Sequence, residues 1–353
     1  MNYMNFGRRT GLRVSQLALG TGNFGTGWGY GSEPTEAKTV FDAYANAGGN
    51  FIDTANGYQV GQSEEIVGDL IAADRDHFVL ATKYTLGVTA DAGISRSGNS
   101  RKSMIQAVEA SLKRLKTDRI DLYWAHASDG ATPMEEILRA FDDLVRSGKI
   151  LYAGLSNFPA WRIARADVLA ELRGWAPLIG IQLEYSLAER SADRELLPMA
   201  EALGLGAALW SPLGGGLLTG KYRGGNTAGR LTGLGGVLVR TEKSEQETAI
   251  LDAVLAIAGE LRVAPGHVAI AWLLEKAQKS STALIPILGS RTRAQFDETL
   301  TALDVKLTPE QVQRLETVSA IELGAPYDIM TSSADRIAGG QQALLRPAFI
   351  PAK

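Results

Sequence analysis

Short runs of apolar residues alternate along the chain with longer stretches in which apolar residues recur every three or four positions. The short runs predict strands at 50–53, 78–83, 119–126, 150–156, 178–184, 206–210 and 284–288. The longer stretches predict helices at 34–47, 62–73, 101–116, 133–146, 160–173, 193–203 and 292–302, and a last helix that opens at Thr308. Residues 1–19 predict a hairpin with a turn at 7–11.

Alternating strands and helices of this kind indicate a parallel sheet covered by helices. An open doubly wound sheet and a closed eight-stranded barrel both fit. Eight strand–helix units without a domain break favour a single (β/α)8 TIM barrel over residues 1–353. The hairpin at 1–19 would close the bottom of the barrel, and long loops after the strands would build a site at its C-terminal face.

Local motifs add detail to this pattern. Thr132 with Glu135, and Thr308 with Gln311, predict capping boxes at two helix starts. Residues 20–25 (GTGNFG) match the dinucleotide-binding fingerprint, but that fingerprint needs a helix to open at once. Here the chain continues as TGWGYG, which no helix would tolerate. We therefore interpret this stretch as a flexible, aromatic-bearing loop at the mouth of a pocket, with a plain surface loop as the alternative.

Composition narrows the class of protein. The 353 residues are 45% hydrophobic and 21% charged, which is typical of a globular chain with a large core. A net charge of −3 without blocks of like charge gives no indication of a nucleic-acid or membrane partner. The absence of cysteine excludes disulfides and thiolate chemistry, and the three histidines lack metal-binding spacing, so no metal is expected. Because no secretory or transmembrane run is present, the expected location is cytoplasmic.

Four polar side chains follow three successive strands at the ends where a barrel places its active site. Asp53 ends one strand and leads to Tyr58, Lys83 ends the next, and His126 ends the one after. A nearby cation such as Lys83 lowers the pKa of a phenol, Asp53 would hold that cation, and His126 could orient a carbonyl oxygen. Taken singly, an Asp at a strand end more often belongs to a turn or caps the next helix, and a Lys there is more often solvated. A lone His is more often a core residue than a catalyst. Three consecutive strand ends with one coherent chemistry favour polarisation of a C=O group and protonation of the alkoxide.

The chain resembles the aldo-keto reductase superfamily, near its potassium-channel β-subunit-like branch, over nearly its whole length. The matching runs are NFIDTA at 50–55 with Tyr58, SE at 63–64, ATK at 81–83, IDLY at 120–123 with His126, GLSNF at 154–158, IQLEYS at 181–186, WSPL at 210–213, LTGK at 218–221 and IPILG at 285–289. The resemblance implies a (β/α)8 barrel and NADP(H)-dependent reduction of an aldehyde or ketone. It also implies that Tyr58 is the general acid, assisted by Lys83, Asp53 and His126.

The resemblance further implies which residues bind the cofactor. Ser156, Asn157 and Gln182 would hold the nicotinamide carboxamide, and Trp210 would stack on the ring. The other cofactor-binding candidates are Gly22, Asn23, Asp53, Ser211, Leu213, Gly215, Leu217, Lys221, Gly289, Ser290, Arg291, Gln295 and Glu298. Ser290 and Arg291 at a helix start form a ready phosphate site, which favours NADP(H) over NAD(H); a solvated helix start is the alternative.

Other segments are given roles by their composition and position. The glycine-rich stretch 211–245 is expected to close over the cofactor, and the tail 321–353 is expected near the substrate mouth. Candidates for an aromatic substrate pocket, which could equally be packing residues, are Phe24, Trp28, Tyr30, Tyr84 and Trp124. The family pattern often has Gly after the catalytic Tyr and Asn after the adenine-contacting Glu; here these positions are Gln59 and Thr299.

Two other functions remain open at this point. A cofactor-binding protein with little turnover, like a potassium-channel β subunit, can retain the same four residues. A barrel hydrolase or isomerase using Asp53 and His126 would leave Lys83 and Arg291 without a role. The small-molecule substrate, the direction of reaction and the oligomeric state are not specified by the sequence.

Overall fold

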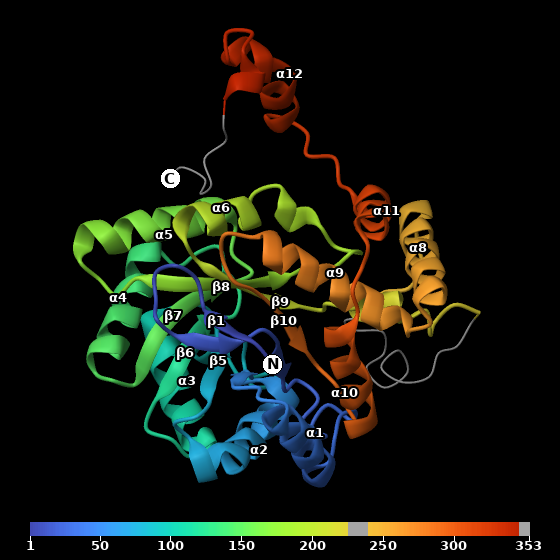
Figure 1. The fold of residues 1–353 in the computed structure, drawn as a ribbon. Coiled ribbons are helices and arrows are strands. Elements are labelled where there is room, and N and C mark those ends of the chain that lie inside the picture. Colours follow the sequence, from blue (N-terminus) through green and yellow to red (C-terminus); the bar gives the residue numbers. More distant parts are fainter. Residues whose placement is uncertain (225–238, 346–353) are drawn as a thin grey trace.

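Eight parallel strands close into a barrel around an apolar core (Figure 1). The computed structural model describes residues 1–224 and 239–345. Around the barrel the strands follow chain order, and the last pairs with the first. They are β3 (Ala18–Gly20), β4 (Phe51–Asp53), β5 (Val79–Tyr84), β6 (Ile120–Ala125), β7 (Ile150–Ser156), β8 (Leu178–Glu184), β9 (Gly206–Trp210) and β10 (Leu284–Leu288). The predicted (β/α)8 barrel is confirmed.

Helices form the outer layer and bury their apolar faces against the strands. They are α1 (Pro34–Asn46), α2 (Gln62–Ile71), α3 (Arg101–Leu115), α4 (Met134–Arg146), α5 (Ala160–Arg173), α6 (Leu196–Leu203), α8 (Glu245–Leu261), α9 (Pro265–Lys279), α10 (Arg293–Leu300), α11 (Pro309–Ser319) and α12 (Tyr327–Ile337). The sequence pattern did not predict α8 and α9. Residues 268–273 of α9 are all buried, so this helix shows no alternation of apolar and polar positions. Among the described residues no single helix is long and apolar enough to cross a membrane; α8 and α9 reach that length only across a 98° bend.

The N-terminal hairpin is present but shorter than the predicted 1–19. Strands β1 (Tyr3–Asn5) and β2 (Arg13–Ser15) pair antiparallel, and the residues that follow form β3, the first strand of the barrel. The boundary was missed because only Gln16 and Leu17 separate β2 from β3, without a glycine or proline to mark a turn.

Phe6, which follows β1 in the hairpin, places its buried aromatic ring in the bottom of the barrel. The ring of Phe6 lies 5.5 Å from Phe51 and 6.2 Å from Trp124, both in edge contacts. A Cβ on Gly180 would lie 2.4 Å from this ring, so the strand can pass Phe6 only with a glycine there. The bottom is therefore filled by side chains, and a ligand has to approach from the opposite end.

The two predicted capping boxes have different outcomes. Thr308 and Gln311 form the predicted box at the start of α11. The box predicted for Thr132 and Glu135 is wrong, because the Thr132 hydroxyl donates to Asp129 and α4 has no side-chain cap.

The two long segments assigned to loops are partly helical. Within 211–245, residues 214–219 form 3-10 turns, residues 225–238 lie outside the described residues, and α8 begins at Glu245. Within 321–353, α12 has no buried residue and stands away from the barrel in Figure 1. The tail also bonds to the segment after β8, through the Glu322 carbonyl with Arg194 and through Tyr327 with Glu195, and the expectation that it packs near the substrate mouth stays a prediction. Residues 346–353 lie outside the described residues.

Candidate active site

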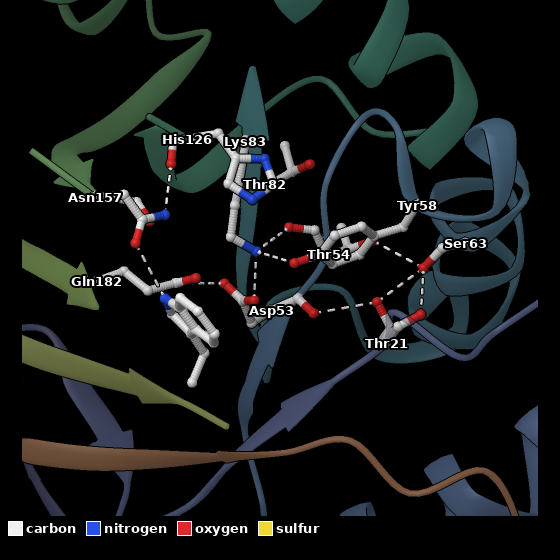
Figure 2. A network of polar contacts seen from close by, with 12 residues as sticks. Thr21, Asp53, Thr54, Tyr58, Ser63, Thr82, Lys83, His126, Asn157 and Gln182 are labelled. Atoms are coloured by element: carbon white, nitrogen blue, oxygen red, sulfur yellow. Dashed lines mark hydrogen bonds and ion pairs between the residues drawn. The ribbon is translucent and has the colours of Figure 1, made fainter. Parts of the chain in front are cut away.

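Asp53, Tyr58 and Lys83 meet at the carboxyl ends of β4 and β5 (Figure 2). Asp53 pairs in register with Ala81, which places Lys83 two residues further along on the same inward face. The Nζ atom of Lys83 lies 2.5 Å from Oδ2 of Asp53, 2.8 Å from the carbonyl oxygen of Thr54 and 3.1 Å from the phenol oxygen of Tyr58. An ammonium group has three N–H donors, so each donor has one acceptor here, and one of these acceptors is the phenol oxygen.

The cation of Lys83 is held inside the protein by its partners. Burial lowers the pKa of this fully buried side chain, but the carboxylate of Asp53 and the oxygen of Tyr58 more than offset burial, so the net pKa is raised. The second carboxylate oxygen, Oδ1 of Asp53, accepts a hydrogen bond of 2.8 Å from the amide nitrogen of Gln182 on β8. Both oxygens of the carboxylate are thus engaged, which fixes the plane of Asp53.

Tyr58 stays protonated at neutral pH in this setting. Burial raises the pKa of the phenol and the charge of Asp53 adds to this, while Lys83 lowers it only in part. The predicted lowering by Lys83 therefore operates, but the net direction is upward because desolvation of a phenolate outweighs it. A protonated phenol beside a cation is suited to giving up its proton to a stronger base that arrives beside it.

His126 lies against the Tyr58 ring as a neutral imidazole. The two ring centroids are 6.0 Å apart in an edge contact. Burial and the charge of Lys83 lower the pKa of His126 to about 3. Its Nδ1 atom is buried without a hydrogen-bond partner among the described residues. A neutral imidazole can carry its proton on Nε2 and donate from there to an oxygen atom near the phenol.

The four residues proposed for the nicotinamide lie on three neighbouring strand ends, β7, β8 and β9. The exposed Asn157 has a left-handed backbone (φ 53°) and donates from Nδ2 to the carbonyl of His126 (2.9 Å) and to Oγ of Ser156 (3.0 Å). Its Oδ1 accepts from Nε1 of Trp210 at 3.3 Å. Gln182 uses its amide nitrogen on Asp53, so its carbonyl oxygen is the atom that remains for a ligand. These side chains therefore form a connected polar strip beside the Tyr58–Lys83–Asp53 cluster (Figure 2).

Beyond this strip the chain turns sharply after β9. Ser211, Gly215 and Gly216 all have left-handed φ values, and Oγ of Ser211 accepts from the Gly215 N–H at 2.8 Å. Leu217 is buried, so only its backbone is available to a ligand, whereas Lys221 is exposed with its ammonium 4.8 Å from the Tyr222 ring. The N–H groups of Gly214, Gly215 and Gly216 are engaged within the turn, so the Ser211 hydroxyl is the polar group that this turn offers to an anionic ligand.

A second cationic position lies where β10 ends. The guanidinium of Arg291 lies 5.2 Å from the centre of the Tyr30 ring, and its Nε is buried without a hydrogen-bond partner among the described residues. The backbone N–H of Arg291 donates to the side-chain oxygen of Gln295 at 3.1 Å. The side-chain amide of Asn23 donates to the carbonyl of Gly289 at 2.8 Å. The neighbouring candidates are Ser290, which is buried, and Glu298, which is exposed on α10. An oriented guanidinium with a free N–H is suited to a phosphate group.

The five aromatic substrate candidates separate into two groups. Phe24, Tyr84 and Trp124 are fully buried: Tyr84 stacks on Tyr123, and Trp124 packs on Phe6 inside the barrel. They are packing residues, and their assignment to the pocket is corrected here. Trp28 is 39% exposed, with its ring 6.0 Å from that of Tyr58. Tyr30 lies against Arg291, so it belongs to that end of the site.

Residues that sequence reasoning missed lie around Tyr58. Thr54 contributes its backbone carbonyl to Lys83, a contact that no side-chain pattern signals. Gln59 directs its side chain into the loop before α1, where it bonds the carbonyl of Gly22 at 2.9 Å. The departure from Gly at this position was visible in the sequence, but its role was not.

Replacing only one partner of the Lys83–Asp53 pair should destabilise the protein more than replacing both. We expect Lys83→Met to lower the free energy of unfolding by roughly 3–5 kcal/mol, because it leaves a buried carboxylate unpaired. The double variant Lys83→Met/Asp53→Asn should recover part of that loss in urea unfolding, since no uncompensated charge remains. A double variant as unstable as the sum of the two single variants would show that the pair is not coupled.

His126 should remain neutral well into the acidic range. Its pKa of about 3 lies below the ordinary value of 6.5, so the folded protein excludes a proton that the unfolded chain accepts between these values. In a nuclear magnetic resonance titration, the His126 ring carbon should show no protonation shift from about pH 8 to about pH 5. His126→Asn identifies the resonance; a midpoint near the ordinary value would contradict the burial argument.

Comparison with known proteins places the chain in a family. The model of the aldo/keto reductase family matches residues 16–320. Norsolorinic acid reductase of Aspergillus flavus is 34% identical over 332 residues, spanning 91% of this chain and 81% of that protein. The uncharacterized oxidoreductase YrpG of Bacillus subtilis is 39% identical over 330 residues (90% and 96%), and the aryl-alcohol dehydrogenase (NADP(+)) of Phanerodontia chrysosporium is 34% identical over 351 residues (92% and 88%). Since these matches extend along nearly the whole barrel, the chain belongs to the aldo/keto reductase family.

Proposed function

We propose that this protein reduces an aldehyde or ketone to an alcohol with NADPH, and that Tyr58 delivers the proton. One observation carries the proposal: the ammonium of Lys83 lies 3.1 Å from the Tyr58 hydroxyl while Asp53 and Thr54 occupy its other two N–H groups. Membership of a family of oxidoreductases supports carbonyl reduction as the reaction class.

The residues of the chain account for the proton and for the orientation of the carbonyl. A bound nicotinamide supplies the hydride that reaches the carbonyl carbon. The Tyr58 O–H bond breaks as its proton passes to the carbonyl oxygen, and the resulting phenolate is stabilised by the adjacent Lys83 cation. His126 donates from Nε2 to the same oxygen and fixes its direction. The reverse reaction uses the same groups, with the Tyr58 phenolate as the base.

The residues of this site fit an extended nicotinamide cofactor. The Ser156 hydroxyl and the side-chain carbonyl oxygens of Asn157 and Gln182 offer a donor and two acceptors to a carboxamide. The turn at Ser211 and Gly215 offers the Ser211 hydroxyl and a glycine backbone that a pyrophosphate can approach closely. Remaining candidates that would line this path are Gly22, Asn23, Leu213, Leu217, Lys221, Gly289, Gln295 and Glu298.

The preference for NADP(H) depends on Arg291. Its orphaned Nε and its fixed position over Tyr30 provide a charged donor for a 2′-phosphate. The relative from Phanerodontia chrysosporium carries NADP(+) in its name, which supports the same choice. NADPH is accordingly the proposed cofactor, and a cytoplasmic location is the proposed setting.

The substrate class we propose is an aryl carbonyl compound. Trp28 presents exposed ring surface beside the proton donor, which favours a flat ring over a short aliphatic chain. Two of the relatives are named for norsolorinic acid and for aryl alcohols. An aromatic aldehyde reduced to its alcohol satisfies both observations.

Tyr58→Phe tests the role of the phenol. We expect kcat for an aromatic aldehyde to fall by a factor of roughly 10²–10⁴, because general acid catalysis is lost. NADPH affinity, measured by fluorescence titration, should be unchanged, since the ring itself remains. Retained turnover in this variant would overturn the assignment, and a wild type that binds NADPH without multiple turnovers on a carbonyl panel would indicate a binding protein.

Arg291→Gln tests the choice of cofactor. We expect NADPH to bind roughly 10–100-fold more weakly, while NADH affinity stays the same, because only NADPH has the phosphate that Arg291 contacts. Arg293→Gln is the matched control: its side chain is exposed and paired with Asp297. Equal losses for NADPH and NADH in Arg291→Gln would place this residue elsewhere than at the 2′-phosphate.

A further inference from the structure

The loop between β3 and α1 (residues 21–33, called the aromatic loop below) is held from beneath by two glutamine side chains. Oε1 of Gln62 accepts from the N–H groups of Thr26 (2.8 Å) and Gly27 (3.1 Å). Oε1 of Gln59 accepts from the N–H of Trp28 at 3.0 Å. Three consecutive backbone donors are therefore satisfied by the segment that follows Tyr58, so the earlier interpretation of a flexible loop is corrected.

Gln59 binds both sides of the aromatic loop at once. Its amide nitrogen donates to the carbonyl oxygens of Gly22 (2.9 Å) and Tyr30 (3.1 Å). The side chain is fully buried, so each of these bonds replaces water that cannot reach it. The Gln59 amide thus links Gly22 to Tyr30 across the aromatic loop and also binds the backbone of Trp28 between them.

This placement is maintained against backbone strain. Gln59 (φ 51°) and Val60 (φ 59°) are both left-handed, and for a β-branched residue this conformation is a true outlier. Such strain persists only where the surrounding structure fixes it. It lies directly after Tyr58, and it turns the Gln59 side chain inward beneath the aromatic loop.

The glycines of the aromatic loop match this arrangement. A Cβ on Gly27 would lie 2.3 Å from the carbonyl oxygen of Gln59, and one on Gly25 would lie 2.7 Å from Oε1 of Gln62. These positions are glycine because the loop backbone rests directly on the glutamines, and not because the loop needs freedom to move.

We propose that Gln59 is a positioning residue that determines specificity: its amide fixes the aromatic loop so that Trp28 forms a wall of the substrate pocket beside Tyr58. The Tyr58 ring makes edge contacts with the rings of His126 and Trp28, and the distance between centroids is 6.0 Å in both contacts. With the wall fixed, the planar ring of an aryl carbonyl can pack on Trp28 while its oxygen reaches Tyr58. This inference rests on the proposed function, and it adds a residue that contacts neither substrate nor cofactor.

Gln59→Gly provides the test, because glycine accepts the left-handed backbone and removes only the clamp. Amide exchange of residues 26–28 should become roughly 10–1,000-fold faster. The ratio of kcat/KM for 2-naphthaldehyde to that for propanal, both with NADPH, should fall about tenfold, mainly through KM for the aryl substrate. Trp28→Ala should lower the same ratio, and the double variant should lose little more than either single variant.

Arg262→Gly is the matched control, since Arg262 is also a left-handed residue (φ 57°) but ends α8 away from the site. It should leave both the exchange rates and the ratio unchanged. Unchanged exchange in Gln59→Gly overturns the clamp, and faster exchange with an unchanged ratio overturns its role in specificity. If the wild type reduces neither aldehyde, the proposed function fails; exchange still tests the clamp, and calorimetric affinity for 2-naphthaldehyde then replaces the rate ratio.

Discussion

The buried ion pair of Lys83 and Asp53 is the constraint on which the rest of the site depends. A cation inside a barrel costs several kcal/mol of lost hydration unless every donor has an acceptor. The chain meets this requirement with a carboxylate, a backbone carbonyl and a phenol. Gln182 on β8 donates a hydrogen bond to the second oxygen of that carboxylate. The chemistry of Tyr58 therefore follows from the solvation of Lys83: the phenol is the third partner of a charge that water cannot reach.

Much of this arrangement was predictable because a parallel barrel brings all strand ends to one edge. Asp53, Tyr58, Lys83 and His126 could be grouped from their positions alone, and the family pattern added the cofactor. Alternation along a strand also explains an error, because Tyr84 follows the inward Lys83 and must point outward, into the layer between strands and helices. Trp124 does face inward, but two residues below His126, where Phe6 fills the space.

Other features could not be predicted, for physical reasons that differ from case to case. The hairpin continues into β3 with only Gln16 and Leu17 between the two strands, and the buried run of α9 has no period. Thr132 lies one residue before Pro133, the N-cap of α4, and its hydroxyl donates to Asp129. The role of Gln59 depends on bonds to residues 22 and 30, about thirty positions away in the chain, and no local pattern encodes them.

The hydrogen bond from Gln182 to Asp53 spans the barrel from β8 to β4, and this has a consequence for how the chain folds. During synthesis, Asp53 and Lys83 leave the ribosome well before residue 182 exists. Until β8 closes against its neighbours, both charges remain hydrated and cost nothing. Their dehydration therefore falls in the closing step of assembly, when the apolar gain of the whole barrel is available to offset it. The full set of contacts to Asp53 can therefore form only when β8 has joined the barrel, because Gln182 supplies one of them.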